Sequence, residues 1–93
     1  MSRTVRRAPE SSRYELVEDG AVIGVADYRE QGDVVVLPHT LIDPSRQGGG
    51  LGAELVGAVL DDLRSRGRQV VPACWYVREF IDQHPDYADL VAG

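Results

Sequence analysis

The residues that most constrain the fold of this 93-residue chain are DPSRQGGGLGAELV, at positions 43–56, where glycine fills four of the five positions from 48 to 52. The most helix-like stretch of the sequence follows directly. A glycine inside a helix costs about 0.5–1 kcal/mol relative to alanine, so the cluster indicates backbone that must stay bare. A helix N-terminus carries unpaired N–H groups and partial positive charge, which an anion reaches only where side chains leave room. The segment therefore predicts a phosphate-binding loop.

Hydrophobic periodicity places this loop between a strand and a helix. The run VVVLPHTLID, residues 34–43, is apolar and bounded by turn signals, which is typical of a strand buried on both faces. Pro38 predicts a bulge or a change of partner within this strand. Beyond the glycines, apolar residues recur every four positions and predict a helix that ends before Gly67. These residues are Leu51, Leu55, Val59 and Leu63.

The other segments predict a small mixed sheet with helices. Residues 14–30 have the pattern of a hairpin with an Asp-Gly turn, residues 69–74 that of a strand, and residues 75–84 that of a helix. The predicted order is β-β-β-α-β-α, an α/β (more strictly α+β) fold whose β-α-β unit forms one parallel strand pair. Residues 1–12 are rich in Arg and Ser and predict a disordered basic tail before a single domain, residues 13–93.

Charge and composition exclude several classes of protein. The first 13 residues carry four arginines against one glutamate, whereas the rest carries six arginines against fourteen acidic residues. An acidic body is a poor nucleic-acid binder and favours a cationic ligand such as an amine. The absence of lysine excludes a P-loop NTPase. No apolar run approaches the roughly 20 residues of a membrane span. The single cysteine, Cys74, excludes an internal disulfide, and we expect no metal site and a cytoplasmic location.

Two ligand patterns fit the glycine loop. GGGLGA matches the dinucleotide fingerprint GxGxxG/A at Gly48, Gly50 and Ala53. That fingerprint requires an acidic residue at the end of the next strand, and this chain has none there. The other pattern, [QR]xxGx[GA], uses Gln47, Gly50 and Gly52.

Four motifs in order resemble the small single-domain branch of the GNAT superfamily of N-acetyltransferases. They are an H-T pair at His39 and Thr40, the glycine loop at residues 47–52, a P-x-C-x-[YF]-V stretch at residues 72–77, and a closing H-P-[ED]-Y at residues 84–87. The resemblance implies a compact GNAT-like fold. Its parallel strands, before and after the glycine helix, splay apart around acetyl-CoA. It also implies that the pantetheine arm lies between residues 37–43 and residues 69–74.

The resemblance assigns the acetyl-CoA pyrophosphate to the backbone amides of the loop. The residues expected to bind the cofactor are Ile42, Asp43, Arg46, Gln47, Gly48, Gly49, Gly50, Leu51 and Gly52. Two readings of Arg46 stay open: it adds a cationic contact to phosphate, or it is a solvated loop residue.

The expected catalytic residues are Cys74 and His39. Cys74 lies near the place where the family holds the thioester, either as a nucleophile or as part of the acetyl pocket. His39 is a candidate general base or a hydrogen-bonded structural histidine. Tyr76 and Tyr87 either donate a proton to the leaving thiolate or pack as aromatic side chains. Related chains often carry a glutamate two residues after the histidine, but Leu41 stands there in this chain.

The resemblance implies an acetyl-CoA-dependent N-acetyltransferase in which an amine attacks the thioester directly. We expect the acceptor to be a small-molecule amine or a lysine-type side chain, and the protein to be a monomer or a homodimer. Two alternatives stay open: a CoA-binding module with little or no turnover, and a protein-interaction domain whose glycine loop holds no ligand.

Overall fold

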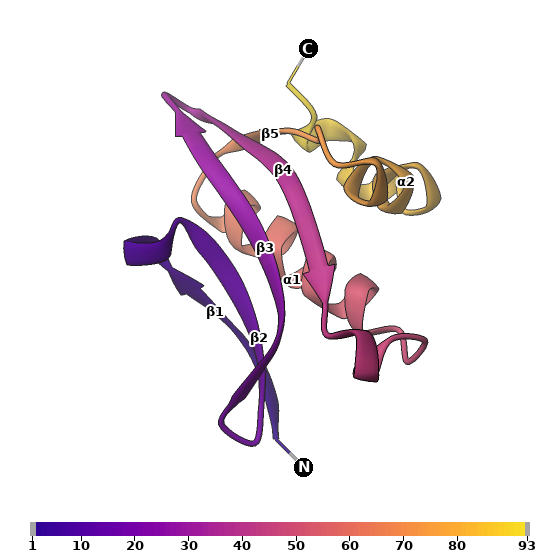
Figure 1. Cartoon of the computed structure of the whole chain (residues 1–93). Coiled ribbons are helices and arrows are strands. Elements are labelled where there is room, and N and C mark those ends of the chain that lie inside the picture. Colours follow the sequence, from indigo (N-terminus) through magenta and orange to yellow (C-terminus); the bar gives the residue numbers. More distant parts are fainter. Residues whose placement is uncertain (1, 93) are drawn as a thin grey trace.

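The computed structural model describes residues 2–92, and within them five strands form one mixed sheet in sequence order. The strands are β1 (Arg3–Ala8), β2 (Arg13–Glu18), β3 (Ala21–Gln31), β4 (Val34–Ile42) and β5 (Gln69–Val71). Helix α1 (Leu51–Ser65) covers one face of the sheet, and α2 (Trp75–Gln83) lies beside its β4–β5 edge (Figure 1). Short 3-10 helices are η1 (Pro9–Ser11), η2 (Pro44–Arg46) and η3 (Pro85–Leu90). Neither α1 nor α2 is long and apolar enough to cross a membrane, and the described residues contain no other helix that is.

The N-terminal segment is a strand, and the disordered tail expected for residues 1–12 is wrong for the residues described. Strand β1 pairs antiparallel with β2 along its whole length. Arg6 donates a hydrogen bond of 2.8 Å to Glu15 of β2, and the Arg7 guanidinium lies 5.0 Å from the centre of the Tyr28 ring. Charged side chains are usual on an edge strand because they discourage pairing with other chains. The order of elements is therefore β-β-β-β-α-β-α, one strand longer than predicted, and Met1 lies outside the described residues.

The bulge predicted at Pro38 is confirmed and changes which side chains face α1. Asp27 pairs with His39 but Arg29 pairs with Val36, so Tyr28 lies opposite two residues of β4. Before the bulge, the odd-numbered residues of β4 are buried under α1. Beyond it the alternation is reset, so His39 and Leu41 are exposed while even-numbered residues lie against the helix side.

Helix α1 begins and ends close to the predicted positions. Its buried stripe consists of Leu51, Leu55, Val56, Val59, Leu60 and Leu63. At its C-terminus, Gly67 N donates to Arg64 O and Arg68 N donates to Leu63 O, each at 3.0 Å. This pair of bonds is the Schellman arrangement expected for a helix that ends at a glycine.

The parallel strands separate where the sequence places two prolines. Strand β5 pairs with β4 only along Val34–Val36, and it ends at Val71, earlier than predicted. Pro72 follows and has no N–H to continue the ladder. One further backbone bond, from Cys74 N to Leu37 O at 2.9 Å, precedes the turn into α2. The rest of β4, from Pro38 onward, therefore lacks a parallel partner.

Candidate functional site

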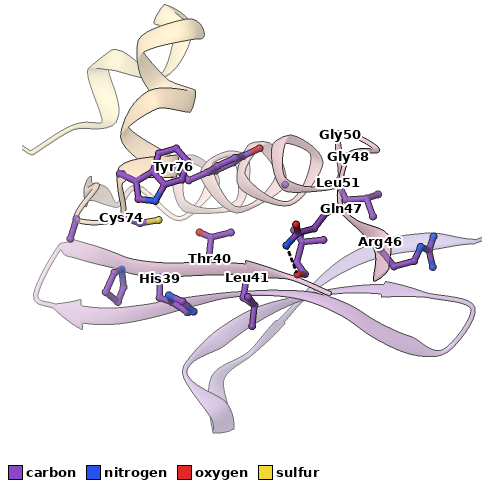
Figure 2. A pocket seen from close by; sticks show the side chains of 15 residues that line it. His39, Thr40, Leu41, Arg46, Gln47, Gly48, Gly50, Leu51, Cys74 and Tyr76 are labelled. Atoms are coloured by element: carbon purple, nitrogen blue, oxygen red, sulfur yellow. Dashed lines mark hydrogen bonds between the residues drawn. The ribbon is translucent and has the colours of Figure 1, made fainter. Parts of the chain in front are cut away.

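A cleft of about 660 Å³ opens where β4 has lost that partner. Its walls are the second half of β4, the glycine loop, the first turn of α1 and the start of α2 (Figure 2). The lining residues are Pro38, His39, Thr40, Leu41, Ile42, Arg46, Gln47, Gly48, Gly50, Leu51, Gly52, Ala73, Cys74, Trp75 and Tyr76. The lining therefore includes seven of the nine predicted cofactor-binding residues and both predicted catalytic residues, whose side chains lie on opposite sides of β4.

The N-terminus of α1 has no side-chain cap among the described residues. The N-cap position is held by Gly50 at φ 75°, where helices usually have Ser, Thr, Asp or Asn. The first backbone bond of the helix runs from Glu54 N to Gly50 O at 3.1 Å, which leaves the N–H groups of the first turn without helical partners. A Cβ atom built on Gly48 or Gly50 would meet no atom within 4 Å, so space for a ligand lies beside this backbone.

Gly52 is needed for a different reason, which is its contact with Tyr76. A Cβ atom at this position would lie 2.6 Å from the Tyr76 hydroxyl oxygen and 2.9 Å from Cζ. Figure 2 shows Tyr76 reaching from α2 along the cleft toward the glycine loop. The close approach places a phenol group against the first turn of α1, beside the bare N–H groups.

The polar side chains of the loop mostly bind the loop itself. Gln47 Nε2 donates to Ile42 O at 3.4 Å. Asp43 accepts hydrogen bonds from the Ser45 backbone N at 2.9 Å and from Ser45 Oγ at 2.8 Å. The Ser45 backbone N–H is the main cause of the lowered pKa of Asp43. Asp43 and Gly49 are not among the residues that line the cleft. The hydrogen bonds to Ser45 make Asp43 the N-cap of η2.

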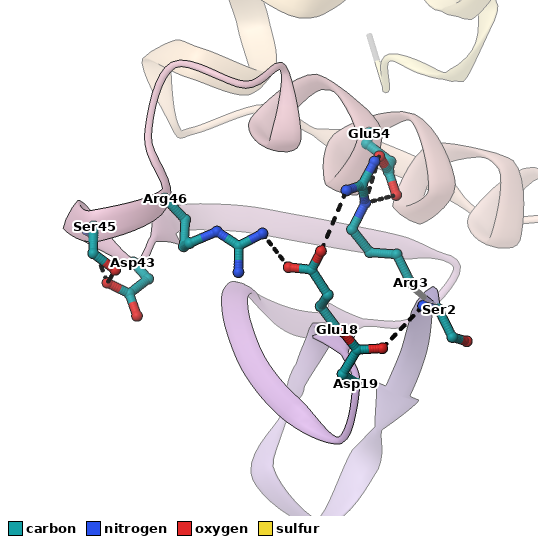
Figure 3. Close-up of polar contacts among 8 residues, drawn as sticks. All are labelled: Ser2, Arg3, Glu18, Asp19, Asp43, Ser45, Arg46 and Glu54. Carbon is teal, nitrogen blue, oxygen red and sulfur yellow. Dashed lines mark hydrogen bonds and ion pairs between the residues drawn. The ribbon is translucent and has the colours of Figure 1, made fainter.

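Arg46 is neither free nor simply solvated, because it forms an ion pair with Glu18 of β2 (Figure 3). Glu18 is 4% exposed. Arg46 therefore contributes positive charge at the rim of the cleft while its guanidinium is held by a buried carboxylate.

The candidate catalytic residues occupy opposite sides of β4. Cys74 is buried and forms the N-cap of α2, and its sulfur points into the cleft (Figure 2). Thr40 also points into the cleft, toward α1. His39 and Leu41 point to the other side of the strand, as the bulge at Pro38 requires.

The lining combines apolar side chains with the polar groups of His39, Thr40, Gln47 and Tyr76 and the cation of Arg46. No aspartate or glutamate is among the lining residues, so no carboxylate base faces the cleft within residues 2–92. Those residues also contain no group of three side chains placed to hold a metal ion.

Sequence reasoning missed several lining residues. It gave no role to Thr40, Ala73 or Trp75, all of which border the cleft. A polar threonine inside a mostly apolar strand was an available signal for Thr40. The exposure of Trp75, 71% in the structure, follows from tertiary packing and had no signal in the sequence.

In this α+β fold, the uncapped N-terminus of α1 opens into a cleft between two separated strands. Such an arrangement suits an extended ligand that carries phosphate. The family model described as GCN5-related N-acetyl-transferase matches residues 13–90, and the chain belongs to this family. No curated protein sequence matches the chain.

Solved structures show the same fold. A GCN5-like protein from Staphylococcus aureus superposes with a TM-score of 0.73 at 16% identity, over 97% of this chain and 88% of that chain. A GNAT family acetyltransferase from Brucella melitensis, solved with acetyl-CoA, gives 0.59 at 24% identity over 77% and 54%. The ribosomal-protein-S18-alanine N-acetyltransferase from Escherichia coli gives 0.59 at 27% identity over 62% and 38%. The chain thus spans only about half or less of the latter two proteins.

Proposed function

We propose that this chain is an acetyl-CoA-dependent N-acetyltransferase. The observation that carries the proposal is the uncapped N-terminus of α1, which opens into a cleft that continues along β4 to Cys74. Membership of the GCN5-related family and the acetyl-CoA complex of the Brucella melitensis protein support it.

Three features of the cleft fit an acyl-CoA. The bare N–H groups at Gly50, Leu51 and Gly52 suit the negatively charged pyrophosphate. The unpartnered part of β4 suits an extended pantetheine arm, and the apolar surroundings of Cys74 suit a small acyl group.

Transfer requires an amine to attack the thioester carbonyl carbon. A C–N bond forms, the C–S bond breaks, the thiolate of CoA leaves, and the amine gives up a proton. In our proposal Cys74 lines the acyl pocket, and the amine attacks directly. His39, on the other side of β4, serves as base for an amine that approaches from that side. The acceptor is a small-molecule amine or a lysine-type side chain, drawn by the acidic body of the protein.

Calorimetric titration with acetyl-CoA tests the binding part of the proposal, and Gly49 offers a matched pair of variants. Its backbone is outside the left-handed region, and a Cβ there would lie 4.0 Å from Leu51 Cγ, which is ordinary contact. Gly49→Glu therefore adds a negative charge between Gly48 and Gly50 without strain. We expect it to weaken binding about tenfold, which corresponds to about 1.4 kcal/mol of repulsion.

The control is Gly49→Gln, which has the same shape without the charge and should bind within about twofold of the unmodified protein. Equal weakening by both variants would mean that bulk, not charge, matters at the loop. Absence of binding by the unmodified protein would overturn the proposal.

A binding module without turnover is the second candidate function. It is favoured by Leu41, which is 50% exposed, and whose side chain, on the other side of β4, stands where similar GNAT-like chains often carry a glutamate. Release of the CoA thiol in the presence of acetyl-CoA and a panel of primary amines separates the two functions. Binding without amine-dependent thiol release would favour the module.

A further inference from the structure

The hydroxyl of Thr40 is the one threonine oxygen among residues 2–92 that is buried without a hydrogen-bond partner. Thr40 lies opposite Ala26 in the β3–β4 register. The bond from Asp43 N to Ile23 O sets which pairs of this antiparallel ladder are hydrogen-bonded, and Thr40–Ala26 is one of the alternate, non-bonded pairs. The backbone N–H and C=O of Thr40 therefore face the unpartnered side of β4, and its side-chain hydroxyl is buried without a partner. A buried donor left without a partner costs about 1–3 kcal/mol, and a valine of the same shape would avoid this cost.

The position of Thr40 points to a ligand as the missing partner. The side chain projects from β4 into the cleft, between Cys74 and the glycine loop (Figure 2). The hydroxyl makes no hydrogen bond to the polar side chains that also line the cleft, Gln47 and Tyr76, and the Cys74 sulfur is only a weak acceptor. A ligand contact requires rotation about the Cα–Cβ bond, which exchanges the positions of the methyl group and the hydroxyl.

We propose that Thr40 is a ligand-contacting residue whose hydroxyl donates a hydrogen bond to a carbonyl oxygen of a bound acyl-pantetheine arm. This inference rests on the proposed function. The arm of acetyl-CoA carries carbonyl oxygens in its two amides and in its thioester, and each of these can accept a hydrogen bond from a hydroxyl in the cleft.

The test compares Thr40→Val, which removes the hydroxyl and keeps the shape, with Thr40→Ser, which keeps the hydroxyl. Each variant and the unmodified protein are titrated calorimetrically with acetyl-CoA and, separately, with CoA. We expect Thr40→Val to weaken acetyl-CoA binding about three- to tenfold, the loss of one neutral hydrogen bond. Thr40→Ser should remain within about twofold of the unmodified protein.

The two ligands identify the carbonyl. A loss confined to acetyl-CoA assigns the bond to the thioester, and an equal loss with CoA assigns it to an amide of the arm. Urea unfolding of the free protein accompanies the titrations, because an unpaired hydroxyl predicts that Thr40→Val is at least as stable as the unmodified protein.

Two results would overturn the inference while leaving the proposed function intact. One is unchanged affinity of Thr40→Val for both ligands. The other is a loss of folding stability in Thr40→Val that Thr40→Ser restores, which would make the hydroxyl a structural group. Failure of the unmodified protein to bind either ligand would instead overturn the proposed function, and with it this inference.

Discussion

Two adjacent glycines of the loop, Gly49 and Gly50, have different backbone conformations. Gly50 has φ 75°, in the left-handed region, whereas Gly49 does not. Left-handed backbone costs a residue with a Cβ atom about 1–2 kcal/mol. We therefore expect Gly50→Ala to lower the free energy of unfolding by about 1–2 kcal/mol. Urea denaturation, monitored by circular dichroism, measures this change in the free energy of unfolding.

Gly49→Ala is the matched control for that prediction. It adds the same methyl group one position earlier and should leave stability unchanged or raise it by up to about 1 kcal/mol, because alanine restricts the unfolded chain. Equal destabilisation by both variants would show that space, and not backbone conformation, sets the cost.

Single residues of the site were only partly predictable from the sequence. The glycine loop was predictable because its signal is local: four glycines immediately before and within the first turn of an amphipathic helix. The directions of His39 and Thr40 were not, because they depend on the bulge opposite Tyr28, which resets the alternation of β4. A proline predicts that a bulge occurs but not on which side of it the register shifts.

Among the elements, β1 shows why sequence patterns fail at a sheet edge. Half of its residues, RTVRRA, are arginines, and only Ala8 is buried. Nothing in the segment itself predicts a strand. The segment forms a strand because β2 supplies its backbone partners and because acidic side chains form ion pairs with its arginines. The central strands and both helices were predictable because each buries its own apolar residues.

The ion pairs at the β1–β2 edge make the stability of the sheet depend on pH. Hydrogen bonds from Arg13 and from Arg6 of β1 hold the pKa of Glu15 below its ordinary value of 4.5. A carboxylate with a lowered pKa in the folded state stabilises the fold above its unfolded pKa, and this contribution is lost as the pH falls through the folded pKa. We expect Glu15→Gln to be less stable than the unmodified protein near pH 7, with a difference that shrinks below about pH 4.

Urea denaturation over a pH series measures this difference. Glu10→Gln, at an exposed position in η1, is the control for the general effect of removing one acid. A difference for Glu15→Gln that stays constant from neutral to acid pH would show that the carboxylate charge does not stabilise the edge of the sheet.

At the scale of the whole molecule, one ion-pair cluster joins segments that are distant in the sequence (Figure 3). Glu18 of β2 lies between Arg46, at the rim of the cleft, and Arg3 of β1, whose guanidinium is 3.6 Å away. Arg3 also donates to both carboxylate oxygens of Glu54 in the first turn of α1, at 3.1 and 3.0 Å. The family model begins at residue 13. Strand β1 precedes that match, yet it supports the two segments that form the candidate phosphate site.

This arrangement predicts that the two arginines depend on each other. Arg3→Ala and Arg46→Ala each leave Glu18 with one guanidinium, whereas the double variant leaves a carboxylate that is 4% exposed with none. An uncompensated buried charge costs more than the loss of two separate surface ion pairs. We expect the double variant to lose about 1 kcal/mol more unfolding free energy than the two single variants together, a coupling typical of residues that share a partner.

A double-mutant cycle by urea denaturation at neutral pH measures this coupling, and Arg6 provides its control. Arg6 also lies on β1 and also pairs with an acid of β2, but its partner is Glu15, which Arg46 does not touch. Arg6→Ala and Arg46→Ala should therefore add within about 0.5 kcal/mol. If Arg3 and Arg46 were equally additive, the glycine loop would be held by its own turn at Asp43 and not by the N-terminal strand. Non-additivity for Arg3 alone would mean that an edge strand, which the sequence pattern hides, fixes the position of the loop from across the sheet.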